Sequence, residues 1–426
     1  MPNQFNSPEG DLENYFVSEY WLIDQYVGDT LWAWGTNNLE GRVGNNSPTG
    51  SGSFSTPVTT SAGGSNWKQV STSFTNSLAI KTDGTLWVWG RNGNTQLGTF
   101  LGPLVACVCT PVTTFGGGTN WKQCSSGGYS SAAIKTDGTL WTWGAGSSGE
   151  LGNNVSTGVT NRCTPVTTFI GGTNWKQVSC GTQFMAAVKT DGTLWTWGNN
   201  AHGTLGINLL GTASNRCTPV TTFVGGTNWK QVSCGVINRS LLALGVGIIT
   251  ATSAAAIKTD GTLWTWGSNS LGQLGINLAT AGTNARCTPV TTFAGGTNWK
   301  SVSSGGLSMA AIKTDGTLWT WGNGGFVALG DNTAATKITP VTTFAGGTNW
   351  KSVTAGTIYT SAIKTDGTLW TWGLNTAAQL GILSTQLGAC TPVTTFAGGS
   401  NWKQVSGGLF TSHAITSGTD PTSFVS

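Results

Sequence analysis

A motif with two tryptophans after an Asp-Gly turn returns along this chain and constrains its fold more than any other feature. In one clear copy, residues 135–144 read Lys-Thr-Asp-Gly-Thr-Leu-Trp-Thr-Trp-Gly. An Asp-Gly pair between alternating runs predicts a tight hairpin, because glycine adopts the positive φ that such a turn needs. The second tryptophan of the motif occurs seven times, at Trp34, Trp89, Trp143, Trp197, Trp266, Trp321 and Trp372. Steps of 51 to 69 residues between copies indicate a repeat architecture.

Each repeat unit contains four short segments with strand character. In the third unit these segments cover residues 164–169, 174–179, 186–189 and 194–198. Side chains alternate along a strand, so Trp195 and Trp197 face the same side of the last segment. About four strands in a unit of about 50 residues is typical of a β-propeller blade. We therefore expect an all-β chain that forms one seven-bladed β-propeller.

The two ends of the repeat are incomplete in complementary ways. The first unit begins with only its last strand, at residues 29–35, and the final unit, at residues 401–415, lacks that strand. We expect the end of the chain to supply strands to the blade that the start leaves open, which closes the ring and removes free sheet edges. The predicted parts are an N-terminal acidic and aromatic arm at 1–27, the propeller at 28–416 and a C-terminal tail at 417–426.

The sequence of the repeat resembles that of a known family. Val-Ser-x-Gly is followed by Ser-Ala-Ala-Ile-Lys-Thr-Asp-Gly-Thr-Leu-Trp-Thr-Trp-Gly and then by Gly-Gln-Leu-Gly, a pattern that resembles the regulator of chromosome condensation (RCC1) repeat over residues 28–416. The resemblance implies a seven-bladed propeller. Members of the family serve as guanine-nucleotide exchange factors, ligase-associated modules and binding platforms, so the fold alone does not determine function.

This chain departs from the chromatin-bound exchange factors of that family. Ser130, Phe184 and Ser308 stand where a histidine is usual, no segment matches an exchange wedge, and the units are nearly identical to one another. In these respects the chain is similar to RCC1-repeat proteins of bacteria and their phages.

Composition argues against several partners. The lysines stand singly at fixed positions, in Trp-Lys and Ile-Lys-Thr, and form no Lys/Arg cluster, so we expect no nucleic-acid partner despite a net charge of +4. No apolar run is long enough to span a membrane, and the N-terminus lacks the basic and apolar regions of a signal peptide, so we expect a soluble chain with no membrane span. Repeat motifs contain 21 of the 22 tryptophans, which favours packing over sugar stacking.

The nine cysteines allow two interpretations. Cys163 and Cys180 are 17 residues apart, as are Cys217 and Cys234, so equivalent disulfides are possible. Small buried thiols in a reducing compartment are the favoured alternative.

Residues that could carry out chemistry are sparse. The two histidines, His202 and His413, belong to no Ser/His/Asp set, and six of the aspartates lie in Asp-Gly-Thr turns whose geometry explains them. The Gly-rich segments precede no helix, so they do not predict phosphate loops. We expect no catalytic residue, no metal and no cofactor, and a protein that is not an enzyme.

Two departures from the repeat are candidate interaction segments. The arm has five carboxylates and no Lys or Arg, and either packs on the propeller or docks onto a partner. Fifteen residues are inserted within 236–250; this apolar insert extends a blade, fills the axial channel or contacts a neighbour. The candidate interaction residues are Phe5, Tyr15, Phe16, Tyr20, Trp21, Tyr26, Ile237, Arg239, Leu241, Leu242, Ile248 and Ile249.

These features lead to two hypotheses about function. The leading one is a non-enzymatic RCC1-like propeller that is a structural or adhesive component of a phage virion (tail, baseplate or capsid decoration), assembled in the host cytoplasm. It would bind other structural subunits through the arm or the 236–250 insert, or a host surface glycan. The alternative is a cytoplasmic protein–protein interaction scaffold of RCC1 type, guanine-nucleotide-exchange-like. A glycan-active enzyme is a third class, but no pair of carboxylates indicates one.

Overall fold

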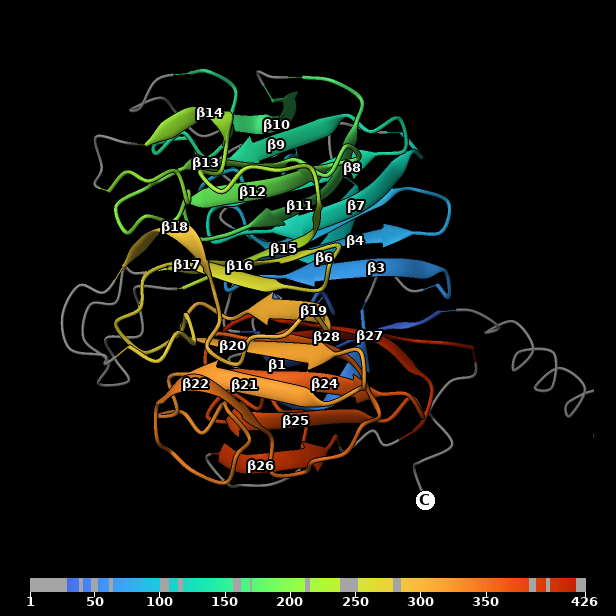
Figure 1. Ribbon diagram of the computed structural model, residues 1–426. Coiled ribbons are helices and arrows are strands. Elements are labelled where there is room, and N and C mark those ends of the chain that lie inside the picture. Colours follow the sequence, from blue (N-terminus) through green and yellow to red (C-terminus); the bar gives the residue numbers. More distant parts are fainter. Residues whose placement is uncertain are drawn as a thin grey trace, which may run out of the picture.

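Seven four-stranded antiparallel sheets, the blades, make up the computed structural model (Figure 1). The structure describes residues 29–37, 41–46, 53–60, 64–99, 107–113, 118–155, 162–168, 171–210, 215–237, 252–278, 285–382, 388–395 and 399–418. The prediction of an all-β propeller is confirmed. None of these residues forms a helix long and apolar enough to cross a membrane.

Six blades consist of strands that follow one another along the chain. Blade 1 contains β3 (Trp67–Thr72), β4 (Asn76–Lys81), β5 (Leu86–Arg91) and β6 (Cys107–Thr113). Blade 2 contains β7 (Trp121–Ser126), β8 (Ser130–Lys135), β9 (Leu140–Gly144) and β10 (Arg162–Thr167). Blade 3 contains β11 (Trp175–Cys180), β12 (Phe184–Lys189), β13 (Leu194–Gly198) and β14 (Arg216–Thr221). Blade 4 contains β15 (Trp229–Cys234), β16 (Ser253–Lys258), β17 (Leu263–Gly267) and β18 (Arg286–Thr291). Blade 5 contains β19 (Trp299–Ser304), β20 (Ser308–Lys313), β21 (Leu318–Gly322) and β22 (Lys337–Thr342). Blade 6 contains β23 (Trp350–Ala355), β24 (Tyr359–Lys364), β25 (Leu369–Leu374) and β26 (Gly388–Thr394).

Blade 7 joins the two ends of the chain. Its strand order is β2 (Ser53–Thr59), β1 (Leu31–Thr36), β28 (Thr411–Thr416) and β27 (Trp402–Gly407). The register pairs Leu31 with Ile415 and Gly35 with Thr411. In Figure 1 the blue strand β1 accordingly lies beside the red strand β28. The predicted closure is confirmed, and it leaves no blade with only half of its strands.

In the sequence each Thr-Pro segment looks like the first strand of a repeat unit. In the structure it is the last strand of the preceding blade. Residues 162–167 form β10, which pairs with β9 of blade 2, and not with the β11 strand that follows it. These segments are the outermost strands of their sheets. Proline suits that place because it has no N–H to donate to a further strand.

The second tryptophan of each Leu-Trp-x-Trp motif locks one blade to the blade before it. Trp197 is fully buried, and its Nε1 donates to the carbonyl of Glu150 at 2.8 Å. A Cβ on Gly152 would lie 2.9 Å from Trp197 Nε1, so this glycine, with φ +62°, is required at the contact. The same donor bond is made by Trp34, Trp89, Trp143, Trp266, Trp321 and Trp372 to the preceding blade. The Gln-Leu-Gly motif of the repeat therefore provides the backbone carbonyl that accepts this hydrogen bond between blades.

Candidate functional site

A lysine held between two tryptophans recurs at one end of the blades. In blade 1 the Nζ of Lys81 lies 4.8 Å from the ring centroid of Trp67 and 4.7 Å from that of Trp87. An ammonium over the face of an indole is attracted by the negative face of the ring. The same arrangement surrounds Lys135, Lys189, Lys258, Lys313 and Lys364, with distances of 4.2 to 4.9 Å. In blade 7 this place is taken by Thr416, whose Oγ1 accepts from Trp32 Nε1.

The Asp-Gly-Thr turn beside each of these lysines carries a fixed negative charge. Asp83 Oδ1 accepts from the backbone N–H of Thr85 at 2.8 Å and from its hydroxyl at 2.7 Å. These hydrogen bonds stabilise the carboxylate and lower the pKa of Asp83 below its ordinary value. Thr85 Oγ1 in turn accepts from Trp87 Nε1 at 2.9 Å, so the turn and the indole are held together. The five equivalent turns, at Asp137, Asp191, Asp260, Asp315 and Asp366, repeat both hydrogen bonds and the lowered pKa.

The ring brings these turns together on one face. The N–H of Trp121, at the start of blade 2, donates to the carbonyl of Gly84 in the turn of blade 1 at 3.0 Å, and every blade repeats this bond. The lysine after each of these tryptophans is exposed, and these seven are Lys68, Lys122, Lys176, Lys230, Lys300, Lys351 and Lys403. Together with the six that tryptophans hold, they place 13 of the 14 lysines of the chain on one face, which we call the lysine face. These lysines stand singly along the sequence, and the repeat returns each of them to the same end of a blade.

Three phenylalanines are exposed on the outer rim of this face. Phe223, Phe293 and Phe344 are 63% to 65% exposed and follow the outermost strands of blades 3, 4 and 5. The preceding residue, Thr222, donates its N–H to the carbonyl of Leu194 beside the Asp-Gly turn, which places the rim at the lysine end of the blade. A large apolar side chain is therefore exposed at the same place in each of three consecutive blades.

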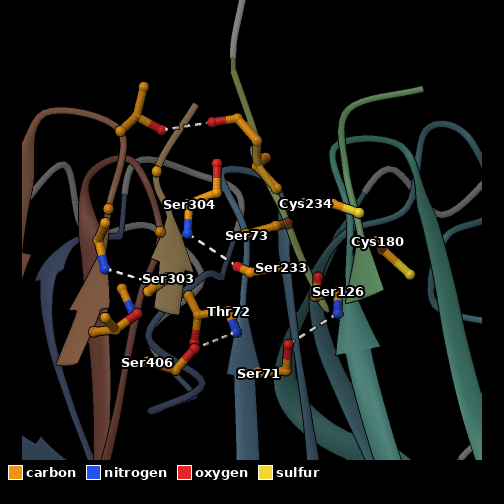
Figure 2. Close-up of a pocket in the computed structure, with 18 of the residues that line it drawn as sticks. Ser71, Thr72, Ser73, Ser126, Cys180, Ser233, Cys234, Ser303, Ser304 and Ser406 are labelled. Carbon is orange, nitrogen blue, oxygen red and sulfur yellow. Dashed lines mark hydrogen bonds between the residues drawn. The ribbon is translucent and has the colours of Figure 1, made fainter. Parts of the chain in front are cut away.

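The innermost strands surround an axial channel whose wall is polar (Figure 2). Each blade places one hydroxyl there, and that hydroxyl accepts a backbone N–H from the next blade. Ser71 Oγ accepts from Ser126 N at 2.9 Å, and Ser406 Oγ closes the circle by accepting from Thr72 N at 2.9 Å. The remaining members of the ring are Ser125, Ser179, Ser233, Ser303 and Thr354. The channel encloses a cavity of about 140 Å³. The hydroxyls line this cavity and also form hydrogen bonds between neighbouring blades.

The base of the 236–250 insert lies at one end of this channel. The carbonyl of Val236 accepts from Thr357 Oγ1 of blade 6 at 3.0 Å, and the N–H of Ile237 donates to Thr182 Oγ1 of blade 3 at 2.7 Å. Ile237 is buried among apolar residues of other blades, which include Phe74, Leu307, Ile358 and Leu409. The described part of the insert, Val236 and Ile237, therefore lies at the end of the axial channel, and the place of residues 238–250 stays a prediction.

The other candidate interaction residues lie outside the described residues. They are Phe5, Tyr15, Phe16, Tyr20, Trp21, Tyr26, Arg239, Leu241, Leu242, Ile248 and Ile249. Their role in binding stays a prediction. The structure shows instead a lysine face and a phenylalanine rim, whose signal in the sequence is the recurrence of these residues at equivalent positions of most units.

Buried titratable groups serve the packing of the ring. His413 is fully buried in β28, its Nδ1 lies 3.0 Å from Thr72 Oγ1 of the next blade, and burial lowers its pKa to about 3. Cys180 and Cys234 are buried free thiols, as the favoured interpretation of the cysteines expects. Burial raises the pKa of Cys180 to about 12, so this thiol is protonated and unreactive at neutral pH. Among the described residues no group of three His, Cys, Asp or Glu side chains could hold a metal ion.

Comparison with known protein families identifies the same repeats along the chain. Two sequence profiles of the regulator of chromosome condensation (RCC1) repeat match the chain. Their matches cover residues 67–96 and 175–204 for one profile, and 83–134, 137–188, 191–236 and 260–312 for the other.

Two similar proteins come from Arabidopsis thaliana. The Ultraviolet-B receptor UVR8 is 28% identical over 316 residues, which cover 72% of this chain and 64% of the receptor. The mitochondrial RCC1 domain-containing protein RUG3 is 30% identical over 220 residues, which cover 49% of this chain and 43% of that protein. The chain therefore spans less than two thirds of the length of either relative.

Solved structures share the fold. Prp20p from Saccharomyces cerevisiae superimposes with a TM-score of 0.77 at 17% identity, over 99% of this chain and 97% of that one. Human WBSCR16 superimposes with a TM-score of 0.74 at 18% identity, over 91% of this chain and 99% of that one.

Proposed function

Because the chain carries repeats of the RCC1 family and folds as an RCC1-like propeller, we propose that it is a non-enzymatic scaffold for protein–protein interaction. The observation that carries this proposal is the phenylalanine rim. Phe223, Phe293 and Phe344 occupy the same place in three consecutive blades and are about two-thirds exposed. Apolar side chains that stay exposed at the same place in successive blades are available to a partner that spans several blades.

The ring supports such a role because it presents a preorganised surface. Three sets of hydrogen bonds join every blade to the next: the tryptophan Nε1 bonds, the channel hydroxyls and the bonds from each Trp-Lys strand to the preceding turn. Residues fixed in this way lose little conformational freedom when a partner binds, so more of the contact energy appears as affinity.

A guanine-nucleotide-exchange-like role is a narrower form of this proposal. Prp20p, which shares the fold, has binding properties to Gsp1p and to histones. Faster release of bound nucleotide from a small GTPase in the presence of this chain would support that form; an unchanged release rate would restrict the proposal to a scaffold.

The virion hypothesis stays a prediction. The relatives described above are cellular proteins of eukaryotes and do not favour it. Mass spectrometry of purified virions from the source sample tests it, and absence of the chain from them would refute it.

A photo-crosslinking experiment tests the scaffold proposal. A photoreactive amino acid replaces Phe223, Phe293 or Phe344 in the full chain, and adducts formed in cells of the source are identified by mass spectrometry. We expect the same partner at neighbouring rim positions, with loss of the adduct when the two other phenylalanines are changed to serine. The control places the photoreactive residue at Ala334, which is exposed in the loop before β22. Equal adducts at the control position, or none at the rim, would contradict the proposal.

A further inference from the structure

We propose that the lysine face docks an acidic segment of a partner polypeptide that carries both carboxylates and apolar side chains. This inference rests on the proposed scaffold function and names the surface and the chemistry of the partner. Three properties of the face lead to it: its charge, the way in which its lysines are held, and the phenylalanine rim on blades 3 to 5.

The first property is an excess of positive charge on one face. The face gathers 13 lysines, against six turn aspartates and Asp29. The whole chain carries a net charge of only +4, so the positive charge is concentrated on this side of the propeller. A concentrated field attracts an oppositely charged partner and accelerates its association.

The second property is that six of these lysines are held in place. Lys81 and its five equivalents lie between two indole faces, with each Nζ less than 5 Å from both centroids. Lysine side chains normally lose rotamer freedom when they form an ion pair, which cancels much of the gain. Here the indoles restrict the side chain before a partner arrives, so a carboxylate meets an ammonium already in position.

The third property, the phenylalanine rim, joins the turn carboxylates and the buried indoles in favouring a polypeptide over a nucleic acid. A turn carboxylate such as Asp83 stands two residues from each held lysine, and such carboxylates interrupt the continuous positive track that a phosphate backbone needs. The indole of Trp67 is buried and already contacts Lys81, so it offers no face on which a base could stack. A polypeptide can place carboxylates against the lysines, donate backbone N–H groups to the aspartates and cover the rim phenylalanines with apolar side chains.

One ion pair of the structure shows that a carboxylate fits this set of lysines. Lys403, the exposed lysine of blade 7, pairs with Asp29, the first described residue of the chain. The other six lysines of that position have no aspartate at the place of Asp29, because glycine occupies it in their blades, as at Gly84 and Gly138. A partner carboxylate would provide there what Asp29 provides to Lys403.

Fluorescence anisotropy with the full chain tests the inference. The probe is a labelled synthetic peptide of alternating Glu and Phe residues separated by glycine, and its control has Gln in place of Glu. We expect the Glu peptide to bind, with an affinity that falls as salt rises, and the Gln peptide to bind at least about tenfold more weakly. Equal binding of the two peptides would overturn the inference.

Two matched charge variants locate the site. The triple variant K122E/K176E/K230E changes exposed lysines that no tryptophan holds, so the blades remain intact. The triple variant R91E/R216E/R286E makes the same change in net charge at the opposite ends of the strands, where Arg91 ends β5 and Arg216 and Arg286 begin β14 and β18. We expect the first variant to lose at least about tenfold in affinity for the Glu peptide and the second to lose less than about threefold. Similar losses would mean that overall charge, and not the lysine face, binds the peptide.

Two further measurements separate other occupants. Tighter binding of duplex DNA than of the Glu peptide would overturn the choice of a polypeptide. Binding of the peptide only after deletion of residues 1–27 would show that the chain's own acidic arm occupies the face, and would overturn the inference of a separate partner. If the peptide fails to bind while crosslinking at Phe223 still captures one partner, the scaffold function stands and only the lysine-face inference fails.

Discussion

At the scale of single residues, Glu150 differs from its equivalents in other blades. Gln96, Gln273 and Gln379 occupy the same place, and in each the side-chain oxygen accepts a backbone N–H two residues earlier. Glu150 keeps this bond, since its Oε2 accepts from Ser148 N at 2.6 Å. Burial nevertheless raises the pKa of Glu150 to about 7. Glu150 is therefore a buried carboxyl group where three other units contain the neutral amide of a glutamine.

We predict that Glu150 makes the stability of the ring depend on pH. Its pKa is higher in the folded chain, about 7, than the ordinary value of 4.5, so the folded state holds a proton that the unfolded state releases. The contribution is fully present below about pH 4.5 and is lost as pH rises through about 7, by up to about 3 kcal/mol. The variant E150Q should remove this loss and unfold at higher denaturant concentration than the natural chain at about pH 8, with little difference at about pH 4.5.

A reciprocal change provides the control. Gln96→Glu places a carboxyl group at the equivalent position of blade 1, where the natural residue is neutral. This variant should show the same loss of stability as pH rises. Parallel denaturation curves for E150Q and the natural chain across this pH range would refute the assignment.

At the scale of strands, glutamines clamp the innermost strand of one blade to that of the next. Gln177 Nε2 donates to the carbonyl of Val232 at 3.0 Å, and its Oε1 accepts from Val232 N at 3.0 Å. The same two bonds are made by Gln69, Gln123, Gln231 and Gln404. Ser301 and Ser352 occupy this place in blades 5 and 6, and the Oγ of each is buried without a hydrogen-bond partner. The interfaces of blade 6 with blades 5 and 7 therefore lack this pair of glutamine hydrogen bonds.

We predict that restoring the clamp stabilises the ring. Ser301→Gln should add two hydrogen bonds to β23, and Ser352→Gln should add two to β27. Each should raise the free energy of unfolding by about 1 kcal/mol, the net value of a typical hydrogen bond or slightly more. Equilibrium denaturation measures the change. The reverse variant, Gln177→Ser, should lower it by a similar amount, and a gain in stability from that variant would contradict the role of the clamp.

At the scale of the whole molecule, closure depends on the last two strands of the chain. Trp34 of β1 packs with Trp402, Val405 and Ala414 from those strands. Tyr359 of blade 6 donates its hydroxyl to the carbonyl of Thr411 at 2.7 Å, so β28 also joins its neighbouring blade. Without β27 and β28, blade 7 would have two strands, and both flanking interfaces would be open to water.

We predict that truncation before residue 401 destroys cooperative folding. Calorimetry of the chain that ends at residue 400 should show no cooperative transition, or one lowered by more than about 10 °C. Deletion of residues 419–426 is the control, because closure is complete at residue 418, and this variant should melt as the full chain does. An unchanged transition after the longer truncation would contradict closure by β27 and β28.

The number of blades and their closure could be predicted from the sequence because the signals are local and repeated. Asp137-Gly138 specifies a hairpin within a few residues, and each further copy confirms the period. The half-unit at Asp29 could be matched to its missing strands by inspection, since pairing within a blade uses the same motifs throughout.

The candidate surface could not be predicted in this way, because it depends on how blades lie against one another. The bonds that set this arrangement, such as Ser126 N to Ser71 Oγ, join residues 55 positions apart, and no hydrophobic period within a unit encodes them. The sequence by itself determined an all-β ring of seven blades that its two ends close together. Only the tertiary structure decided that single, widely spaced lysines such as Lys81 and Lys135 share one face, because the register between blades, and not the spacing along the chain, places equivalent residues side by side.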